Sequence, residues 1–221
     1  RAEAEVRDTA ARGAAVIPFP RVLAGQQAAT ATAPPRLASD NLAAMTPRRQ
    51  QILDTAAELF AERGYHGVSV ADLGAACGVS GPALYKHFPS KEAMLSEMLV
   101  SISDELLAQG RLRVRQSKGP AHALQLLVDW HIDFALGHRA LIIVQDRDWA
   151  SLPPAARDQV RSLQREYVDL WAVQLRRVDT DLRPETARAA AHITFGLINS
   201  TPRIASLPDD QMRELLRSMA L

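Results

Sequence analysis

The stretch of sequence at residues 69–95, SVADLGAACGVSGPALYKHFPSKEAML, decides the fold. Apolar residues recur at helical spacing as far as Gly78, which ends a first short helix. Ser80 then has the hydrogen-bonding side chain of an N-cap, and Pro89 ends the second short helix that follows. With Val79 packing inward from the turn, the two helices form a helix-turn-helix unit.

Helical periodicity continues on both sides of this unit. Upstream, Thr46 is an N-cap residue before Pro47, and apolar residues then repeat every three or four positions until Gly64. Downstream, Ser90 begins a helix that we expect to span residues 90–109 and to end at Gly110. Further helical stretches follow after Gly119-Pro120, around Leu141–Val144, from Val160 to Val178, from Pro184 to Ile198 and from Pro208 to Met219. No stretch has the alternating pattern of a strand, so the predicted fold class is all-α.

Composition limits the class of protein. The chain has 221 residues and a formal net charge of +1, so any binding to nucleic acid must come from a local patch. Cys77 is the single cysteine, which excludes an internal disulfide framework and a multi-cysteine metal site. No apolar run approaches the roughly 20 residues that span a bilayer, and residues 1–20 lack the pattern of a signal peptide. We therefore expect a soluble, cytoplasmic protein that does not associate with membranes.

The sequence has no motif typical of an enzyme. It contains no Gly-rich phosphate loop, no Gly-x-Ser-x-Gly elbow and no His-Glu-x-x-His pair. His131 and His138 are seven residues apart and have no defined third ligand, which is a poor basis for a zinc site. We therefore predict neither catalysis, nor a metal, nor a cofactor.

Four motifs carry a family resemblance when they are taken together: Gly64-Tyr65, Ser69–Leu73, Cys77–Ser80 and the run Leu84–Leu95, LYKHFPSKEAML. Helix-turn-helix spacing alone fits a plain helical hairpin inside a bundle equally well. With these motifs at their intervals, residues 48–96 resemble the DNA-binding half of the TetR family of bacterial transcriptional regulators. In the C-terminal half only the all-helical pattern agrees with that family.

The resemblance divides the chain into three parts. Residues 46–89 are expected to form a three-helix DNA-binding domain, and residues 90–221 a helical domain for ligand binding and dimerisation. Residues 1–45 are Ala-rich, contain scattered Arg and Pro, and have no sustained period, so we expect a disordered arm. An inert leader is the favoured interpretation of this arm, and a segment that lies along DNA is the alternative.

The resemblance also implies DNA-binding residues. Those expected to bind phosphate oxygens, and so to fix register, are Ser69, Tyr85, His87 and Lys91. Those expected to face the major groove, after the cap at Ser80, are Gly81, Pro82, Ala83 and Lys86, of which only Lys86 has a long donor for a guanine. Residues 46–100 have a formal balance of 5 basic − 6 acidic = −1, so the DNA-binding surface requires segregation of charge. We expect Arg48 and Arg49 to complete a positive edge with Lys86 and Lys91.

Aromatic residues are concentrated in the helices of the C-terminal half. Trp130 and Phe134 are four residues apart, as are Tyr167 and Trp171, so each pair lies on one helical face. A bundle lined in this way can enclose a mostly apolar cavity with a few polar anchors, although such stripes also fit simple core packing. The candidate ligand-binding residues are Trp130, His131, Phe134, Gln145, Trp149, Tyr167, Trp171 and Phe195. A small, largely hydrophobic effector is expected, with acyl thioesters and other lipid-related metabolites as one candidate class.

A helix-turn-helix monomer makes few base contacts, so a homodimer that binds a palindromic operator is expected. The resemblance places pairing in the last two helices, at residues that are small or apolar: Ala187, Ala190, Ala191, Thr194, Leu197, Ile198, Leu215, Leu216 and Met219. Effector binding would then act through the helix at residues 90–109 to release DNA, which describes a repressor. The alternative is a helical DNA-binding or interaction protein without a small-molecule ligand, which a fully packed bundle would favour.

Overall fold

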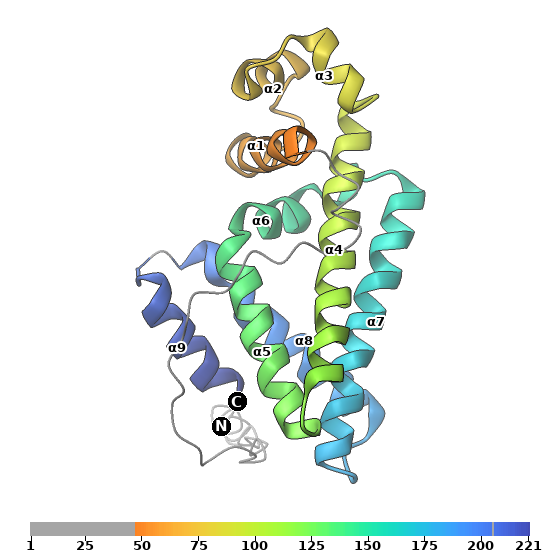
Figure 1. Ribbon diagram of the computed structural model, residues 1–221, viewed down its shortest axis with the longest axis vertical. Coiled ribbons are helices and arrows are strands. Elements are labelled where there is room, and N and C mark those ends of the chain that lie inside the picture. The colour runs from red at the N-terminus through yellow and green to blue at the C-terminus, as the bar shows by residue number, and fades with distance from the viewer. Residues whose placement is uncertain (1–46, 205) are drawn as a thin grey trace, which may run out of the picture. The chain divides into compact units, whose positions relative to one another are not determined.

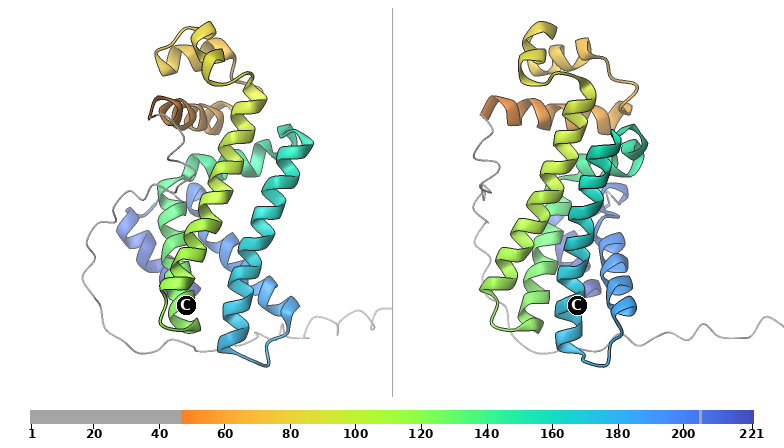
Figure 2. Two further views of the ribbon diagram at one scale, coloured as in Figure 1. Left: turned by 45° about the vertical axis from the view of Figure 1, so that its right-hand side comes forward. Right: turned by 90° about the vertical axis from the view of Figure 1, so that its right-hand side faces the viewer.

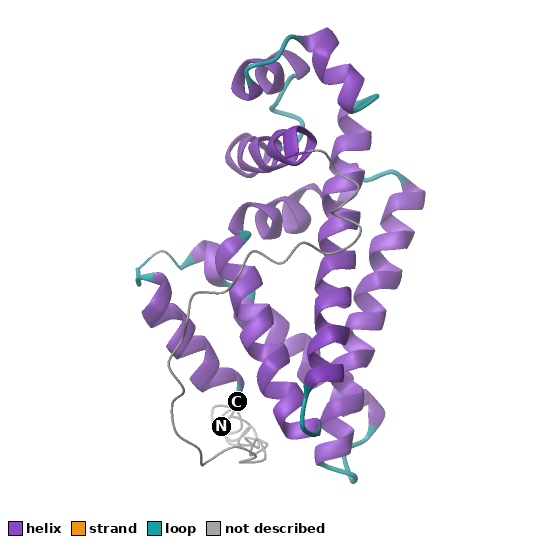
Figure 3. Ribbon diagram, viewed as in Figure 1, coloured by secondary structure: helices purple, strands orange, loops and turns teal. Residues whose placement is uncertain are grey.

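The computed structural model describes residues 47–204 and 206–221, and every regular element in that part of the chain is a helix (Figure 3). The α-helices are α1 (Pro47–Arg63), α2 (Val70–Cys77), α3 (Gly81–His87), α4 (Lys91–Gln116), α5 (Pro120–Gly137), α6 (Arg139–Asp148), α7 (Pro154–Val178), α8 (Pro184–Ile198) and α9 (Asp209–Ala220). Single 3-10 turns lie at Trp149–Ser151 and Thr201–Arg203. The predicted all-α class is confirmed. The expected arm at residues 1–45 and the N-cap at Thr46 lie outside the described residues.

The helices are arranged around α4 (Figure 1). Helices α1, α2 and α3 surround its N-terminal end, whereas α5 and α7 run beside the rest of it, with α8 and α9 packed further out. Helix α6 lies across the bundle directly beneath α1, an arrangement that is visible in all views (Figure 2). Among the described residues, no helix has both the length and the apolar character needed to cross a membrane.

Two clusters of buried apolar side chains form the core, and α4 contributes to both. Met94, Leu95 and Leu99 pack in a first cluster with the apolar faces of α1, α2 and α3. Ile102 and Leu107 pack in a second cluster with α5, α7, α8 and α9. Helix α4 therefore joins the two clusters, whose apolar burial is the main favourable term in folding.

Helix α4 does not end at Gly110, as the sequence had indicated, but continues to Gln116. Gly110 lies inside the helix, at a position where the ring of Tyr167 occupies the space that a side chain would need. A Cβ atom at this position would lie only 2.7 Å from Tyr167 Cε2 and 3.1 Å from Leu170 Cδ2. The glycine therefore permits the close approach of α4 and α7, and is not a helix stop.

Candidate functional site

Local hydrogen bonds set the geometry of the helix-turn-helix unit. The hydroxyl of Ser69 accepts from the Asp72 N–H at 3.1 Å, and the Asp72 carboxylate accepts from the Ser69 N–H at 2.8 Å, which is a capping box at the start of α2. The Ser69 hydroxyl also donates to the Asp72 carboxylate, and this bond, together with the one from the Ser69 N–H, lowers the pKa of Asp72. At the other end Gly78 has a φ of 64°, a left-handed conformation that glycine adopts without steric cost. The turn after α2 is thus specified by backbone chemistry.

Helix α3 presents one face to solvent and buries the other. Leu84 and Phe88 are almost fully buried, so Phe88 is a core residue as expected. Tyr85 is 52% exposed and therefore does not pack in the core. Among the other residues expected to contact DNA, Ser80, Pro82 and Lys86 are exposed, whereas Gly81, Ala83 and His87 are half-buried. Of the four residues predicted to face the major groove, Pro82 and Lys86 lie on the exposed face of α3.

Lys91 has an internal role that conflicts with the predicted phosphate contact. Its Nζ donates to the carbonyl oxygens of Tyr65 at 2.8 Å and Val68 at 2.9 Å, and lies 4.2 Å from the centre of the Tyr65 ring. These contacts hold the start of α4 against the loop between α1 and α2. The ammonium is engaged with the protein's own backbone, so Lys91 positions the unit, and its phosphate contact stays a prediction.

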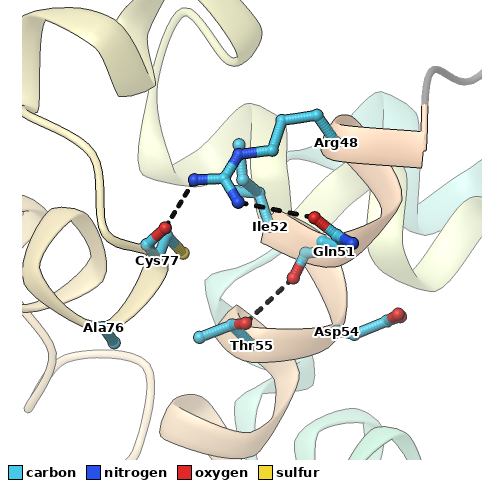
Figure 4. A pocket seen from close by; sticks show the side chains of 7 residues that line it. All are labelled: Arg48, Gln51, Ile52, Asp54, Thr55, Ala76 and Cys77. Carbon is cyan, nitrogen blue, oxygen red and sulfur yellow. Dashed lines mark hydrogen bonds between the residues drawn. The ribbon is translucent and has the colours of Figure 1, made fainter.

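The two arginines at the start of α1 are also engaged with the protein. Arg48 Nη2 donates to the Cys77 carbonyl oxygen at 2.6 Å, across a pocket of about 350 Å³ between α1 and α2 (Figure 4). Arg49 Nε donates to Glu97 Oε1 at 2.7 Å, and its guanidinium also donates to the His87 carbonyl oxygen. Both arginines therefore hold α1 against its neighbours. The positive edge expected from them is reduced, because the Glu97 carboxylate neutralises the charge of Arg49.

Cys77 borders the same pocket and behaves as a small core residue. It is 9% exposed, and burial raises the pKa of its thiol. A buried thiol with a raised pKa keeps its proton at neutral pH and is a poor nucleophile. This position agrees with the interpretation of Cys77 as a packing residue.

A cavity of about 200 Å³ lies in the middle of the C-terminal bundle. Five helices contribute to its wall, namely α4, α5, α6, α7 and α8. Of the candidate ligand-binding residues, those in the wall are His131, Phe134, Gln145, Tyr167 and Phe195. The remaining wall residues are Ile102, Leu106, Leu141, Ile142, Asp146, Gln164, Val168, His192 and Asn199. The bundle is therefore not fully packed at this place.

The three tryptophans expected to line the cavity lie elsewhere. Trp149 begins the 3-10 turn after α6 and packs against the first apolar cluster. Trp130 is covered by the Arg113 guanidinium, 4.2 Å from its ring centre. Trp171 is 2% exposed and meets the rings of His131 and Phe195 edge-on, outside the set of wall residues. These predictions were wrong because helical spacing shows which residues share a face of a helix, but not which of them border a cavity.

Sequence reasoning also missed polar residues of the wall. Gln164 lies three residues before Tyr167 on α7, and Asn199 lies four residues after Phe195 at the end of α8. Both are therefore one helical turn from an aromatic that was selected. The sequence signal for these two amides is their helical spacing, one turn from Tyr167 and from Phe195.

His131 is the central polar residue of the wall. Its Nδ1 lies 3.3 Å from the Tyr167 hydroxyl and its Nε2 lies 3.2 Å from Asn199 Oδ1. The imidazole lies nearly parallel to the rings of Tyr167 and Phe195, at centroid distances of 5.7 and 4.7 Å, and these two rings are themselves 5.3 Å apart, so the three rings form one cluster. Complete burial lowers the pKa of His131 to about 4, because the charged imidazolium would lose its hydration. The ring is therefore neutral at physiological pH.

Both parts of the chain described above match known protein families. Residues 52–98 match the family described as bacterial regulatory proteins, tetR family, and residues 117–203 match the tetracyclin repressor-like C-terminal domain. The chain is 33% identical over 141 residues to the transcriptional repressor KstR2 of Rhodococcus jostii, covering 63% of this chain and 68% of that protein. The chain belongs to the TetR family. It is thus a DNA-binding transcriptional regulator with a ligand-binding C-terminal domain.

Solved structures agree with this assignment. A TetR-family regulator from Bordetella parapertussis has a TM-score of 0.72 and 27% identity, over 80% of this chain and 95% of that one. AibR, whose structure contains isovaleryl coenzyme A and operator DNA, has a TM-score of 0.66 and 24% identity, over 78% of this chain and 97% of that one. At 24% identity, the comparison with AibR shows a similarity of fold alone.

In this TetR-family protein α6 connects the cavity to the DNA-binding domain. Its middle contributes wall residues such as Gln145, and the next turn contacts α1. Arg147 Nη1 donates to the Ala61 carbonyl oxygen at 3.0 Å, and Nη2 donates to that of Phe60. The Asp148 carboxylate accepts from the Tyr65 N–H at 3.3 Å. Arg147 therefore caps carbonyl oxygens in the last turn of α1, whereas Asp148 holds the loop that follows α1.

The first prediction for the TetR-family protein concerns α3. Tyr85→Ala should weaken binding to all DNA sequences alike, by roughly 1 kcal/mol or more, because a phosphate contact carries no sequence information. Lys86→Ala should lower the preference for particular base pairs by about 1–3 kcal/mol. Titration of a panel of operator variants measures both effects, with Tyr85→Phe as a control that removes only the hydroxyl. Equal, sequence-independent losses from both alanine variants would contradict this division of roles.

The second prediction concerns His131. Its pKa is lower in the folded protein than in the unfolded chain, so the unfolded chain takes up a proton first as the pH falls. This residue should therefore cost about 3 kcal/mol of stability between pH 6.5 and pH 4. Urea unfolding at pH 7 and pH 4.5 measures the loss, and His131→Gln should lack that component. A variant with the same pH dependence as the wild type would refute the assignment of a neutral, buried His131.

Proposed function

We propose that this protein is a homodimeric repressor that binds a palindromic operator and is released by a small, largely hydrophobic effector. The observation that supports this proposal is the position of α6, which lines the cavity and caps α1. A hollow bundle weighs against the alternative of an interaction protein without a ligand. A regulator of this kind acts where the chromosome lies, so we propose a cytoplasmic location.

The DNA contacts are proposed for the exposed face of α3. Tyr85 and His87 would donate to phosphate oxygens, and Lys86 would reach a base edge in the major groove. Gly81 and Ala83 leave room for the DNA to approach, so part of the specificity would come from DNA shape. The hydroxyl and the N–H of Ser69 are both used in the capping box, so a phosphate contact of Ser69 would have to replace one of these hydrogen bonds.

Dimerisation is proposed through α8 and α9, with a changed set of residues. Ala187, Ala191, Ile198 and Leu216 face the interior of their own subunit and are buried there, so they cannot form the contact with a second copy. The apolar side chains that stay exposed are Ile193 on α8, at 63%, and Leu215 and Met219 on α9, at 45% and 59%. Exposed apolar side chains on adjacent helices are a typical feature of a protein interface.

The effector is proposed to be an acyl thioester or a related lipid metabolite. The cavity is smaller than the roughly 300–1,000 Å³ of sites for whole drug-sized ligands, so only one end of a larger molecule fits. Its wall contains no Lys or Arg, and its central histidine is neutral. The wall contains one carboxylate, that of Asp146, which forms an ion pair with Arg203 at 2.9 Å. An uncharged acyl group inside and a charged remainder outside would fit this distribution.

Release from DNA is proposed to act through both α4 and α6. The sequence suggested α4 alone, and Ile102 and Leu106 do place α4 in the cavity wall. Helix α6 contributes more of the wall and ends in the cap on α1. A ligand that displaces α6 would therefore move α1 and change the separation of the two α3 helices in the dimer. The coupling energy required is typically about 1–3 kcal/mol.

The dimer proposal predicts the behaviour of two variants. Leu215→Glu should yield a monomer and weaken operator binding by at least about tenfold, because an unpaired charge would be buried between subunits. Ile204→Glu is the control, since Ile204 is similarly exposed, at 42%, but lies outside both helices. Sedimentation measures the oligomeric state, and footprinting of captured genomic DNA tests for a palindrome with half-sites about one helical turn apart. A dimeric Leu215→Glu protein, or an unprotected genomic fragment, would contradict the proposal.

The release mechanism predicts a loss of coupling in Arg147→Ala. This variant should bind isovaleryl coenzyme A as the wild type does, because Arg147 is not part of the cavity wall. Its operator affinity should respond at least about threefold less to that compound, because the cap between α6 and α1 is gone. Arg111→Ala is the control, since it removes an exposed ion pair with Glu166 between α4 and α7. An unchanged response in Arg147→Ala would show that α6 does not transmit the signal.

A further inference from the structure

One polar chain crosses the wall of the cavity, from Tyr167 through His131 to Asn199. Tyr167 and His131 are fully buried, whereas Asn199 is half-buried at the end of α8 and belongs to the cavity wall. A buried polar chain is stable only when each donor faces an acceptor. The direction of its hydrogen bonds therefore determines what the chain offers to a ligand.

The direction follows from the protonation of His131. A neutral imidazole has one N–H donor and one acceptor nitrogen. Because Nε2 faces the amide oxygen of Asn199, it carries the hydrogen and donates to Oδ1 at 3.2 Å. Nδ1 must then accept, so the Tyr167 hydroxyl donates to it at 3.3 Å. Burial raises the pKa of Tyr167, so this hydroxyl keeps its proton.

The chain thus ends at an amide whose acceptor is occupied and whose donors are not. Asn199 Oδ1 is held by His131, and the amide nitrogen keeps two N–H groups that form no hydrogen bond with any of the described side chains or backbone. The wall side chains Ile102, Phe195 and Val168 are apolar and cannot accept them, and no hydrogen bond joins them to the polar wall residues Gln145, Asp146, Gln164 and His192. The cavity wall therefore contains a donor without a partner among the described residues.

We infer that Asn199 is a specificity-determining residue, whose amide nitrogen donates a hydrogen bond to the carbonyl oxygen of the effector. Tyr167 and His131 are positioning residues, because they hold the amide in the orientation that points its donor at the ligand. A free carboxylate is disfavoured at this place, since the wall contains no Lys or Arg to pair with it. The inference rests on the proposed function, and within it selects a neutral carbonyl such as that of a thioester.

The test compares two ligands that differ in that carbonyl alone. Isovaleryl coenzyme A carries it, and S-(3-methylbutyl) coenzyme A has a methylene group instead. Calorimetric titration of the full chain should show the thioester binding about tenfold more tightly, as expected for one hydrogen bond to a donor that is otherwise left unpaired. Asn199→Leu should remove this preference and leave the affinity for the thioether unchanged, which also shows that the variant is folded.

Further variants separate the residues of the wall. Asn199→Asp keeps the acceptor for His131 but has no N–H, so it should lose the preference as well. Tyr167→Phe should reduce the preference without abolishing binding of the thioether, because the chain loses its fixed direction. Gln164→Leu, which removes another amide from the same wall, should retain the tenfold preference. Loss of the preference in Gln164→Leu but not in Asn199→Leu would overturn the assignment.

The remaining outcomes distinguish this inference from the proposed function. If both compounds bind the wild type equally, Asn199 does not recognise the carbonyl, whereas the cavity is still an effector site. If neither compound binds, the acyl thioester class is wrong, and the carbonyl contact is withdrawn with it. If only the thioester weakens operator binding and Asn199→Leu abolishes that effect, the carbonyl contact and the proposed function are both supported.

Discussion

The structure depends on the participation of α4 in both apolar clusters. Its N-terminal half packs with α1, α2 and α3, and its C-terminal half packs with α5 and α7. An α-helix with all its backbone hydrogen bonds formed transmits displacement along its length. The DNA-binding unit and the effector cavity thus share one rigid element, and Gly110 allows that element to lie close against α7.

Helix α6 provides a second connection. Both helices combine apolar packing with hydrogen bonds: Leu95 of α4 and Val144 of α6 belong to the first apolar cluster, whereas Lys91 of α4 and Arg147 of α6 donate to backbone carbonyls. Apolar packing is nondirectional, but hydrogen bonds to helix-end carbonyls require a defined position. The hydrogen bonds of Arg147 and Asp148 therefore fix the position of α6 relative to the end of α1 and to Tyr65.

The charged residues near the DNA-binding helices serve the fold as much as they serve DNA. Arg48, Arg49 and Lys91 were each expected on a positive edge, yet all three donate to backbone carbonyls of their own domain. Their donors satisfy helix ends and loop carbonyls that would otherwise lack partners. With these donors used inside the domain, the side chains exposed on α3 stay the predicted contacts with DNA.

The sequence by itself determined the class, the helix-turn-helix unit and the family, because helical periodicity, caps and turn residues are local properties of the chain. It also identified His131, Phe134, Gln145, Tyr167 and Phe195 as wall residues of the cavity. Only the tertiary structure showed that Trp130, Trp149 and Trp171 lie outside that wall, that Lys91 bonds to Tyr65 and Val68, and that Asn199 ends a polar chain. The physical reason is that helical spacing specifies which residues share a face, whereas the packing of other helices decides whether that face meets core, cavity or solvent.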